Sequence, residues 1–166
     1  MMNFLRRRNL LFGCAALLAG CGRADAKPKT AGAFAGSEWR DVSEAEWKKR
    51  LAPAAFAVLR REDTERPWSS PLNKVKRRGT FVCAGCALPL FSSDWKYDSG
   101  TGWPSFWTGM KQNIATKRDF KLIIPRTEYH CARCLGHQGH ILPDGPPNKG
   151  GIRYCNNGLA LNFTPA

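Results

Sequence analysis

The pattern of apolar and polar residues changes near Glu38. The preceding residues 22–37 are rich in Ala, Gly, Lys and Pro and have no apolar period, which is typical of a flexible tether. Ser43 followed by Glu46 forms a capping box, in which side chain and backbone satisfy each other's free donors, so a short helix is predicted to begin there. A second helix is predicted to open at Pro53 and to carry the apolar residues Phe56, Val58 and Leu59.

From residue 79 onward the pattern is that of strands and turns. Gly, Pro, Asn and Asp recur every few residues between short runs rich in β-forming residues. In the last run Leu159, Leu161 and Phe163 alternate with small or polar residues, which predicts that the three share one face of a strand. The predicted strands are residues 80–83, 120–124, 127–131, 152–155 and 159–163.

The first 21 residues are typical of an export signal. Residues 6–8 are all Arg and precede an apolar run that ends in small residues and is too short to span a bilayer. Residues 7–11 look like a twin-arginine signal, and residues 18–21 look like the lipobox of a bacterial lipoprotein, in which Cys21 becomes lipidated. A plain cleaved signal peptide is the alternative. Either signal predicts a location in the bacterial periplasm or cell envelope, and the lipobox adds a lipid anchor to the membrane.

Length and charge limit the classes of function. A chain of 166 residues suits one domain, residues 38–166, which can bury a core without disulfides as its main support. The net charge of +13 raises nucleic acid as a partner, but the basic residues are scattered apart from short runs such as residues 74–78. A solvated basic surface is the simpler interpretation, so no nucleic acid is expected as a partner.

Four of the seven cysteines form two Cys-x-x-Cys hooks, Cys83 with Cys86 and Cys131 with Cys134. This spacing lets both thiolates of a hook reach one tetrahedral metal ion, and two hooks supply the four ligands of a closed structural zinc site. Because the gap between the hooks is longer than in a compact zinc ribbon, the ion is expected to tie distant strands together.

A redox role for the hooks is the competing interpretation. Disulfides form outside the cytoplasm, and a Cys-x-x-Cys can be a thioredoxin-like active site. A thioredoxin-type motif occurs once, at the start of a helix, whereas here a matched pair lies among turn residues. One structural Zn²⁺ is therefore favoured, and an oxidised, metal-free protein is the alternative.

Cys155 remains once the hooks and the two cysteines of the signal are set aside. A lone cysteine is usually a small buried hydrophobe. Arg153, however, lies on the same face of a regular strand, and a nearby cation favours the thiolate form. Asn157 and Gly158 suggest a tight turn that keeps Cys155 near an exposed strand end. These neighbours predict a nucleophile.

Two further groups are candidates for chemistry. His137 and His140 follow the second hook; they could be zinc ligands or surface residues, but four thiolates already fill a structural site. Imidazole titrates near neutral pH, so general acid catalysis is the sharper interpretation. Trp103, flanked by glycine and proline, is a candidate pocket wall, whereas the nearby Phe106 could belong to the core or to the substrate site.

Short motifs follow one another in a fixed order along the chain. They are Thr64-Glu65-Arg66-Pro67, the two hooks, Asp98-Ser99-Gly100, Gly102-Trp103-Pro104-Ser105-Phe106, Arg126-Thr127-Glu128, His137-x-Gly139-His140, Pro143-Asp144-Gly145-Pro146 and Arg153-Tyr154-Cys155-x-Asn157. In this order they resemble the B-type methionine-R-sulfoxide reductases, over about residues 38–163. The resemblance implies a mainly β fold of two packed antiparallel sheets, the β-tent, with short N-terminal helices and a zinc ion away from the catalytic face.

The resemblance also implies a mechanism and partners. Cys155 attacks the sulfoxide sulfur and becomes a sulfenic acid, while His137 and His140 help to protonate the departing oxygen and Asn157 orients a water or a histidine. Substrates are oxidised proteins or free methionine sulfoxide, and a monomer is expected. The substrate-binding residues are then Trp103, which holds the methyl group, Phe106 and Arg153.

Thr101 departs from the pattern of this family. Many members have a resolving cysteine in the loop before Gly102, and threonine cannot form a disulfide with Cys155. The external reductant is therefore expected to act directly on the sulfenic acid, and a thioredoxin-like protein, a glutaredoxin system or a small thiol would serve. The alternative interpretation is a non-catalytic protein, a zinc-bound β interaction module in which Cys155 is buried and takes no part in a reaction.

Overall fold

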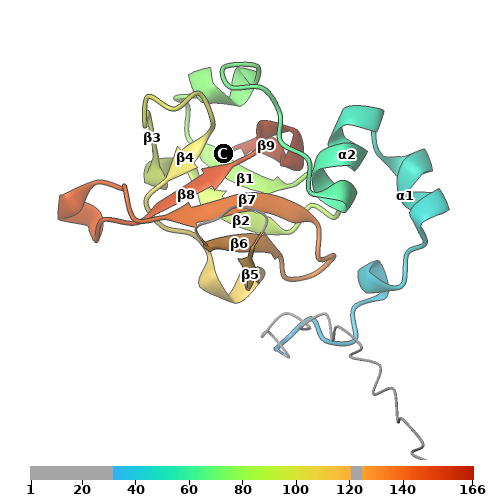
Figure 1. Cartoon of the computed structure of the whole chain (residues 1–166). Coiled ribbons are helices and arrows are strands. Elements are labelled where there is room, and N and C mark those ends of the chain that lie inside the picture. Colours follow the sequence, from blue (N-terminus) through green and yellow to red (C-terminus); the bar gives the residue numbers. More distant parts are fainter. Residues whose placement is uncertain (1–31, 121–124) are drawn as a thin grey trace, which may run out of the picture.

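The computed structural model describes residues 32–120 and 125–166, and it opens with short helices at one end of the strands (Figure 1). They are η1 (Glu38–Arg40), α1 (Glu44–Arg50) and α2 (Pro53–Arg61). Ser43 Oγ accepts a hydrogen bond from Glu46 N at 3.2 Å and so caps the start of α1, while the Glu46 carboxylate accepts from Arg50 Nε at 2.9 Å. Trp47 and the three predicted apolar residues of α2 are buried. Both predicted helices are confirmed.

The predicted export signal and Cys21 lie outside the described residues. The last part of the predicted tether, residues 32–37, is described, and there Phe34 packs against the core beneath the guanidinium of Arg133. This end of the tether therefore belongs to the folded domain. In the described ranges no helix is both long and apolar enough to cross a membrane.

The rest of the described chain forms two antiparallel sheets, as the resemblance implied. The smaller sheet has the order β2-β1-β9 and the larger one the order β3-β4-β8-β7-β6-β5. Short 3₁₀ helices, η2 to η6, occupy the connections. The strands are β1 (Gly79–Cys83), β2 (Pro89–Ser92), β3 (Lys96–Tyr97), β4 (Ser105–Phe106), β5 (Ile114–Asp119), β6 (Arg126–Cys131), β7 (His137–Leu142), β8 (Arg153–Asn156) and β9 (Leu161–Pro165), and the 3₁₀ helices are η2 (Pro71–Lys74), η3 (Ser93–Trp95), η4 (Lys111–Asn113), η5 (Pro147–Lys149) and η6 (Gly158–Ala160).

Some strand boundaries differ from the prediction. Residues 158–160 form η6, so Leu159 is 37% exposed while Leu161 is buried in β9, and the predicted alternation over one strand is wrong there. The predicted strand 120–124 lies largely outside the described residues, and β5 ends just before it. Strands β2, β3, β4, β5 and β7 were not predicted. β3 and β4 are only two residues long, and the glycine and polar residues of β7 hide its period.

Aromatic rings join the two sheets in the core. Phe91 of β2 stacks on Phe106 of β4 with ring centroids 4.1 Å apart, and Phe81 of β1 meets the edge of Phe106 at 5.0 Å. Phe106 is fully buried. Its sequence-based assignment to substrate binding is therefore corrected: the ring supports β4 from the core side and is not among the residues that line the pocket at Cys155.

Candidate active site and metal centre

The two Cys-x-x-Cys hooks meet at the ends of β1 and β6. Cys83 Sγ lies 3.6 Å from Cys134 Sγ, and Cys86 Sγ lies 3.4 Å from Cys131 Sγ. All four sulfurs are buried and lie within 4.8 Å of one another. Four thiolates at about 2.3 Å from a tetrahedral zinc ion are about 3.8 Å apart. The cluster therefore has the size and the donor set that a structural zinc ion requires.

The two hooks have the same type of backbone turn. Ala87 N donates to Cys83 O at 2.8 Å, and Leu135 N donates to Cys131 O at 2.9 Å. Ala87 and Leu135 have the same left-handed φ of 58°, which is uncommon for residues other than glycine. Two matching turns in an unusual conformation indicate that the backbone is shaped to aim both pairs of sulfurs at one point.

Positive side chains surround the second hook. Arg40 donates to Ala132 O at 2.7 Å and Arg60 donates to Cys134 O at 2.9 Å. Hydrogen bonds among the four cysteines raise the pKa of the Cys83 and Cys134 thiols and lower the pKa of the Cys86 and Cys131 thiols. Four buried thiolates this close together would repel one another, so a cation is needed to stabilise them, and the hooks would hold a metal ion as a structural link between the sheets.

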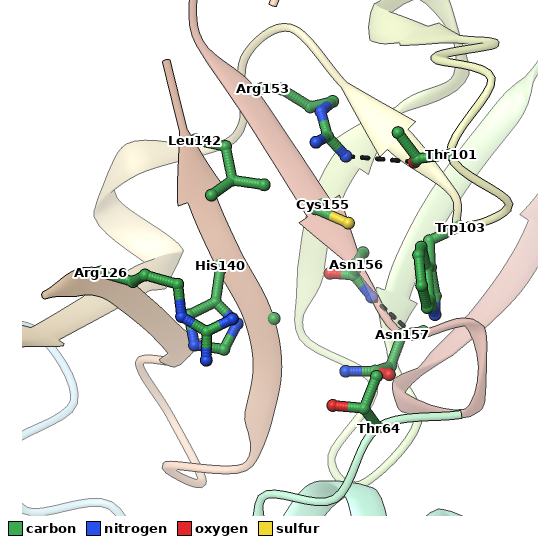
Figure 2. Close-up of a pocket in the computed structure, with 11 residues that line it drawn as sticks. Thr64, Thr101, Trp103, Arg126, His140, Leu142, Arg153, Cys155, Asn156 and Asn157 are labelled. Carbon is green, nitrogen blue, oxygen red and sulfur yellow. Dashed lines mark hydrogen bonds between the residues drawn. The ribbon is translucent and has the colours of Figure 1, made fainter. Parts of the chain in front are cut away.

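A second group of the predicted residues lines a pocket of about 240 Å³. Figure 2 shows Cys155 on β8 between His140 on one side and Trp103 on the other. This volume is below the range of about 300–1,000 Å³ that is typical of pockets for whole small molecules, so it suits one side chain. The pocket is lined by Thr64, Thr101, Trp103, Arg126, Gly139, His140, Leu142, Arg153, Cys155, Asn156 and Asn157.

Strand register places the histidine beside the thiol. His140 of β7 is the direct partner of Cys155 on β8, and Glu128 of β6 is the direct partner of His140. Directly opposed residues of antiparallel strands share a face of the sheet. A Cβ atom at Gly139 would lie 1.9 Å from Cys155 O, so only glycine permits this approach of β7 to β8. Cys155, His140 and Glu128 therefore form one row.

A bulge in β7 brings His137 into the same cluster. The register of β6 and β7 shifts between Tyr129 and His130, so that His137 pairs with His130. Because one residue of β7 is extra, His137 and His140 can both turn toward Glu128 although they are three positions apart. His137 Nδ1 lies 2.5 Å and His130 Nε2 lies 2.8 Å from Glu128 Oε1.

The Glu128 carboxylate is held ionised at the centre of this cluster. Burial acts to raise its pKa, but hydrogen bonds from His130 and His137 outweigh burial, and the pKa lies well below the usual range. His137 is 2% exposed and does not line the pocket, whereas His140 does. The ring centroids of the two histidines are 5.7 Å apart. Of the two predicted acids, His140 is thus the one that faces the pocket.

Opposing effects act on the Cys155 thiol. Burial raises its pKa, and the charge and hydrogen bond of Arg153 lower it by less. Arg153 is itself fixed by a bidentate pair with Asp144, at 2.8 and 2.6 Å, and by a bond to Thr101 Oγ1 at 3.2 Å. The sequence-based expectation that Arg153 favours the thiolate is correct in direction, but burial is the larger effect, so the neutral thiol predominates near pH 7.

The facing imidazole is also neutral near pH 7. Burial lowers the pKa of His140, and the hydrogen bond to Asp119 Oδ2 at 2.7 Å offsets this only in part. Arg126 also bonds to Asp119, at 2.8 Å, and its charge disfavours the imidazolium. The pocket therefore holds a neutral thiol beside a neutral imidazole, a pair between which a proton can be transferred.

Trp103 and Asn157 are fixed by the segment that follows α2. Trp103 Nε1 donates to Glu65 O at 3.1 Å, which sets the indole as one wall of the pocket. Asn157 Oδ1 accepts from Glu65 N at 3.1 Å, and Asn157 Nδ2 donates to Gln138 O at 3.1 Å. Both ends of the Asn157 amide are thus hydrogen-bonded to backbone groups. The side chain joins the Glu65 segment to β7 at the edge of the pocket.

Asp144, Asp119 and Arg126 were not among the predicted site residues. Asp144 and Arg126 lie in the Pro143–Pro146 and Arg126–Glu128 motifs, so motif membership was the available signal for them. Asp119 ends β5, in no motif, and only the pairing of β5 with β6 brings it to Arg126. A contact made across strands leaves no trace in local sequence.

Removing the cation beside Cys155 gives a test by pH. In Arg153→Met the pKa of Cys155 is expected to rise further, because burial is then no longer offset. The thiolate fraction below that pKa falls about tenfold for each unit of rise. The rate of Cys155 alkylation by iodoacetamide can be measured by peptide mass spectrometry at pH values from 6 to 10. Its pH profile should move to higher pH in this variant.

Asp144→Asn is the matched control, for which a shift of the Cys155 pKa in the opposite direction is expected. The Asp144 charge acts to raise the pKa of Cys155, so its removal should move the alkylation profile toward lower pH. Identical profiles for both variants and the unaltered protein would contradict this account of the thiol.

The fold and the site together define a β-protein that combines a four-cysteine metal centre with a separate pocket thiol faced by histidine. The model of the SelR domain matches residues 51–165. Peptide methionine sulfoxide reductase MsrB of Bradyrhizobium diazoefficiens is 48% identical over 124 residues, which cover 74% of this chain and 88% of that protein. The protein of the same name from Methanosarcina barkeri is 47% identical over 124 residues, covering 74% and 87%.

This chain belongs to the SelR family, the B-type methionine sulfoxide reductases, which are oxidoreductases that act on peptide methionine sulfoxide. Among solved structures, the Mis18 "Yippee-like" domain is 15% identical to this chain with a TM-score of 0.42. The alignment covers 54% of this chain and 98% of that domain. Membership of the family rests on the sequence relatives alone.

Proposed function

We propose that Cys155 carries the reduction of methionine R-sulfoxide in oxidised proteins and passes through a sulfenic acid. The observation that supports this most directly is the register of Cys155 opposite His140, in a side-chain-sized pocket walled by Trp103. A thiol is a suitable nucleophile toward the sulfur of a sulfoxide, and the imidazole of His140, directly opposite Cys155, can transfer a proton.

The step balances with the groups present. The Cys155 sulfur attacks the sulfoxide sulfur as its proton leaves by way of His140, and the proton ends on the sulfoxide oxygen. The oxygen is transferred to Cys155, which becomes Cys–SOH, while the substrate leaves as methionine. Two electrons have passed from the thiol to the sulfoxide. Two external thiols then return Cys–SOH to the thiol, with one water and one disulfide as products.

Choice of the epimer would follow from the two sides of the pocket. The indole of Trp103 offers an apolar surface to the methyl group, and sulfur–aromatic attraction of about 0.3–1.5 kcal/mol supports that placement. His140 and Arg126 present the polar side. The choice of the R epimer itself rests on the resemblance to the B-type family, and these two sides are the features that would distinguish the epimers.

Turnover of the two epimers separately, in peptides and as the free amino acid, tests the proposal. With dithiothreitol, glutathione plus glutaredoxin, or thioredoxin as reductant, the R epimer should be consumed and the S epimer left. Equal consumption of both epimers, or none of the R epimer with any reductant, would contradict the assignment.

Reduction is expected to proceed without an internal disulfide. Thr101 lines the pocket and hydrogen-bonds Arg153, so the position of the family's resolving cysteine carries a hydroxyl. After one turnover without reductant, mass spectrometry with dimedone should find a sulfenic acid adduct on Cys155 and intact hooks. A disulfide between Cys155 and any other cysteine of the chain would overturn this prediction.

Thr101→Cys supplies the matched positive control. Thr101 and Cys155 line the same pocket, so this variant should trap a disulfide between them after one turnover and lose the dimedone adduct. Failure of the variant to form that disulfide would show that position 101 does not reach Cys155.

We infer that the metal of the hooks is one structural Zn²⁺. Closed four-thiolate coordination leaves no open position for substrate, which supports a structural role. None of the four cysteines lines the pocket. Inductively coupled plasma mass spectrometry of the purified protein should give one zinc per chain, and a different metal or none would contradict this inference.

We further propose export to the periplasm or cell envelope, with Cys21 lipidated. The support is the sequence Leu-Ala-Gly-Cys at residues 18–21 after the apolar run. Intact-mass measurement of the native membrane fraction should reveal a diacylated or triacylated chain that begins at Cys21. A soluble chain cleaved elsewhere would favour the plain signal peptide.

A further inference from the structure

Trp68 combines two features that oppose folding. Its side chain is 63% exposed, which leaves a large apolar surface in water. Its backbone has a φ of 66°, in the left-handed region that bulky residues rarely adopt. A strained, exposed aromatic residue gains nothing from the core, so a contact outside the chain is the better explanation of its presence.

Trp68 lies against the loop that forms the pocket wall. Trp68 N donates to Gly102 O at 2.7 Å, and a Cβ atom at Gly102 would lie 3.0 Å from Cε2 of the Trp68 indole. Gly102 stands between Thr101 and Trp103, which both line the pocket. The Trp68 indole therefore covers Gly102 at the rim of the pocket, one residue from the wall that Trp103 forms.

Of the other three exposed large hydrophobic residues of the described chain, Ile152 and Leu159 are close in sequence to pocket residues, whereas Phe120, 71% exposed, follows the end of β5. Ile152, 38% exposed, directly precedes the pocket residue Arg153. Leu159, 37% exposed, follows the pocket residue Asn157 by two positions. Of these four residues, Trp68 is the most exposed one that contacts the pocket loop, through Gly102.

We propose that Trp68 is a specificity-determining residue, and that its indole binds an apolar side chain adjacent to the methionine sulfoxide of a polypeptide substrate. The inference rests on the proposed function. A pocket of about 240 Å³ takes up one side chain, so the residues that flank the oxidised methionine must lie across the rim. The occupant is an extended, unfolded segment in which an apolar residue neighbours the sulfoxide, as in damaged protein.

A pair of pentapeptides tests the inference. Both carry methionine R-sulfoxide at the centre, flanked by leucine in one and by serine in the other. The ratio of kcat/KM for the leucine peptide over the serine peptide should be about ten, and Trp68→Ala should reduce it to about one. Trp68→Phe, which keeps an aromatic ring, should retain most of the preference.

Phe34→Ala provides the matched control. Phe34 is a partly buried aromatic that packs beneath Arg133, a residue of the second hook, and its removal should leave the ratio at about ten. A Trp68→Ala variant with an unchanged ratio would overturn the inference, as would an unaltered protein that shows no preference.

Two further measurements separate this inference from a structural role and from the proposed function. On the Cys155→Ser background, which is expected not to turn over, the Kd for the leucine peptide should rise about tenfold on Trp68→Ala. Binding thus tests Trp68 even if Cys155 is not the nucleophile. Trp68→Gly relieves the backbone strain, so its Tm should equal or exceed that of the unaltered protein. A lower Tm with an unchanged peptide ratio would assign Trp68 to packing and overturn the inference.

Discussion

Cys155→Ser is expected to abolish methionine sulfoxide reduction, with kcat/KM falling by at least about 10⁴-fold, as when the nucleophile of a catalytic unit is removed. A serine hydroxyl at this position is not ionised near neutral pH and is a poor nucleophile toward sulfur. In the described chain the other cysteines are the four of the hooks, and none of them lines the pocket. The assay is consumption of the R-sulfoxide peptide with dithiothreitol, followed by chromatography.

The fold should survive this substitution, which makes it a clean test. Cys155 is partly exposed and lies outside the metal cluster, so zinc content and Tm should stay within error of the unaltered protein. Turnover above a few per cent in a correctly folded Cys155→Ser protein would show that another group carries the reaction. Background turnover in both the unaltered and the Cys155→Ser protein would favour a non-catalytic zinc-bound module.

Loss of one hook ligand, as in Cys131→Ser, is expected to unfold much of the domain at ordinary temperature. Structural zinc contributes roughly 10–16 kcal/mol of apparent binding free energy in small peptides, while whole domains are stable by only about 5–15 kcal/mol. Even a loss of about 5 kcal/mol would lower Tm by about 20 °C in a domain of this size. Circular dichroism during heating, with zinc content measured in parallel, checks this expectation.

The hooks have this effect because they join elements that are far apart in the chain. Cys83 ends β1 of the smaller sheet and Cys131 ends β6 of the larger one, while Arg60 of α2 donates to Cys134 O. Gln138 then links the cluster to the pocket, because its Nε2 lies 3.5 Å from Cys83 Sγ and its carbonyl accepts from Asn157.

Chelation of zinc should therefore reduce activity in step with metal loss, although no hook residue lines the pocket. Cys155→Ser is the control for zinc content alone, since it removes a thiol outside the cluster and should lose activity without losing zinc. A metal-free protein with an unchanged Tm and full activity would contradict the structural role of the cluster.

The features that the sequence determined are those set by neighbours a few positions apart. Ser43 and Glu46 define a helix start because a capping bond spans three residues, and a Cys-x-x-Cys hook needs only its own turn to aim two sulfurs at one point. The order of the motifs likewise determined the family. Local chemistry of this kind is the same wherever the segment lies in the fold.

Tertiary structure alone decided how those pieces meet and how they titrate. The bulge that turns His137 toward Glu128, the pairing of His140 with Cys155 and the burial of Phe106 depend on strands that are distant in the chain. The Cys155 pKa was judged from Arg153 alone in the sequence, yet desolvation is the sum over everything that covers the thiol. Burial and strand register are properties of the whole packed chain, so no short segment of sequence carries them.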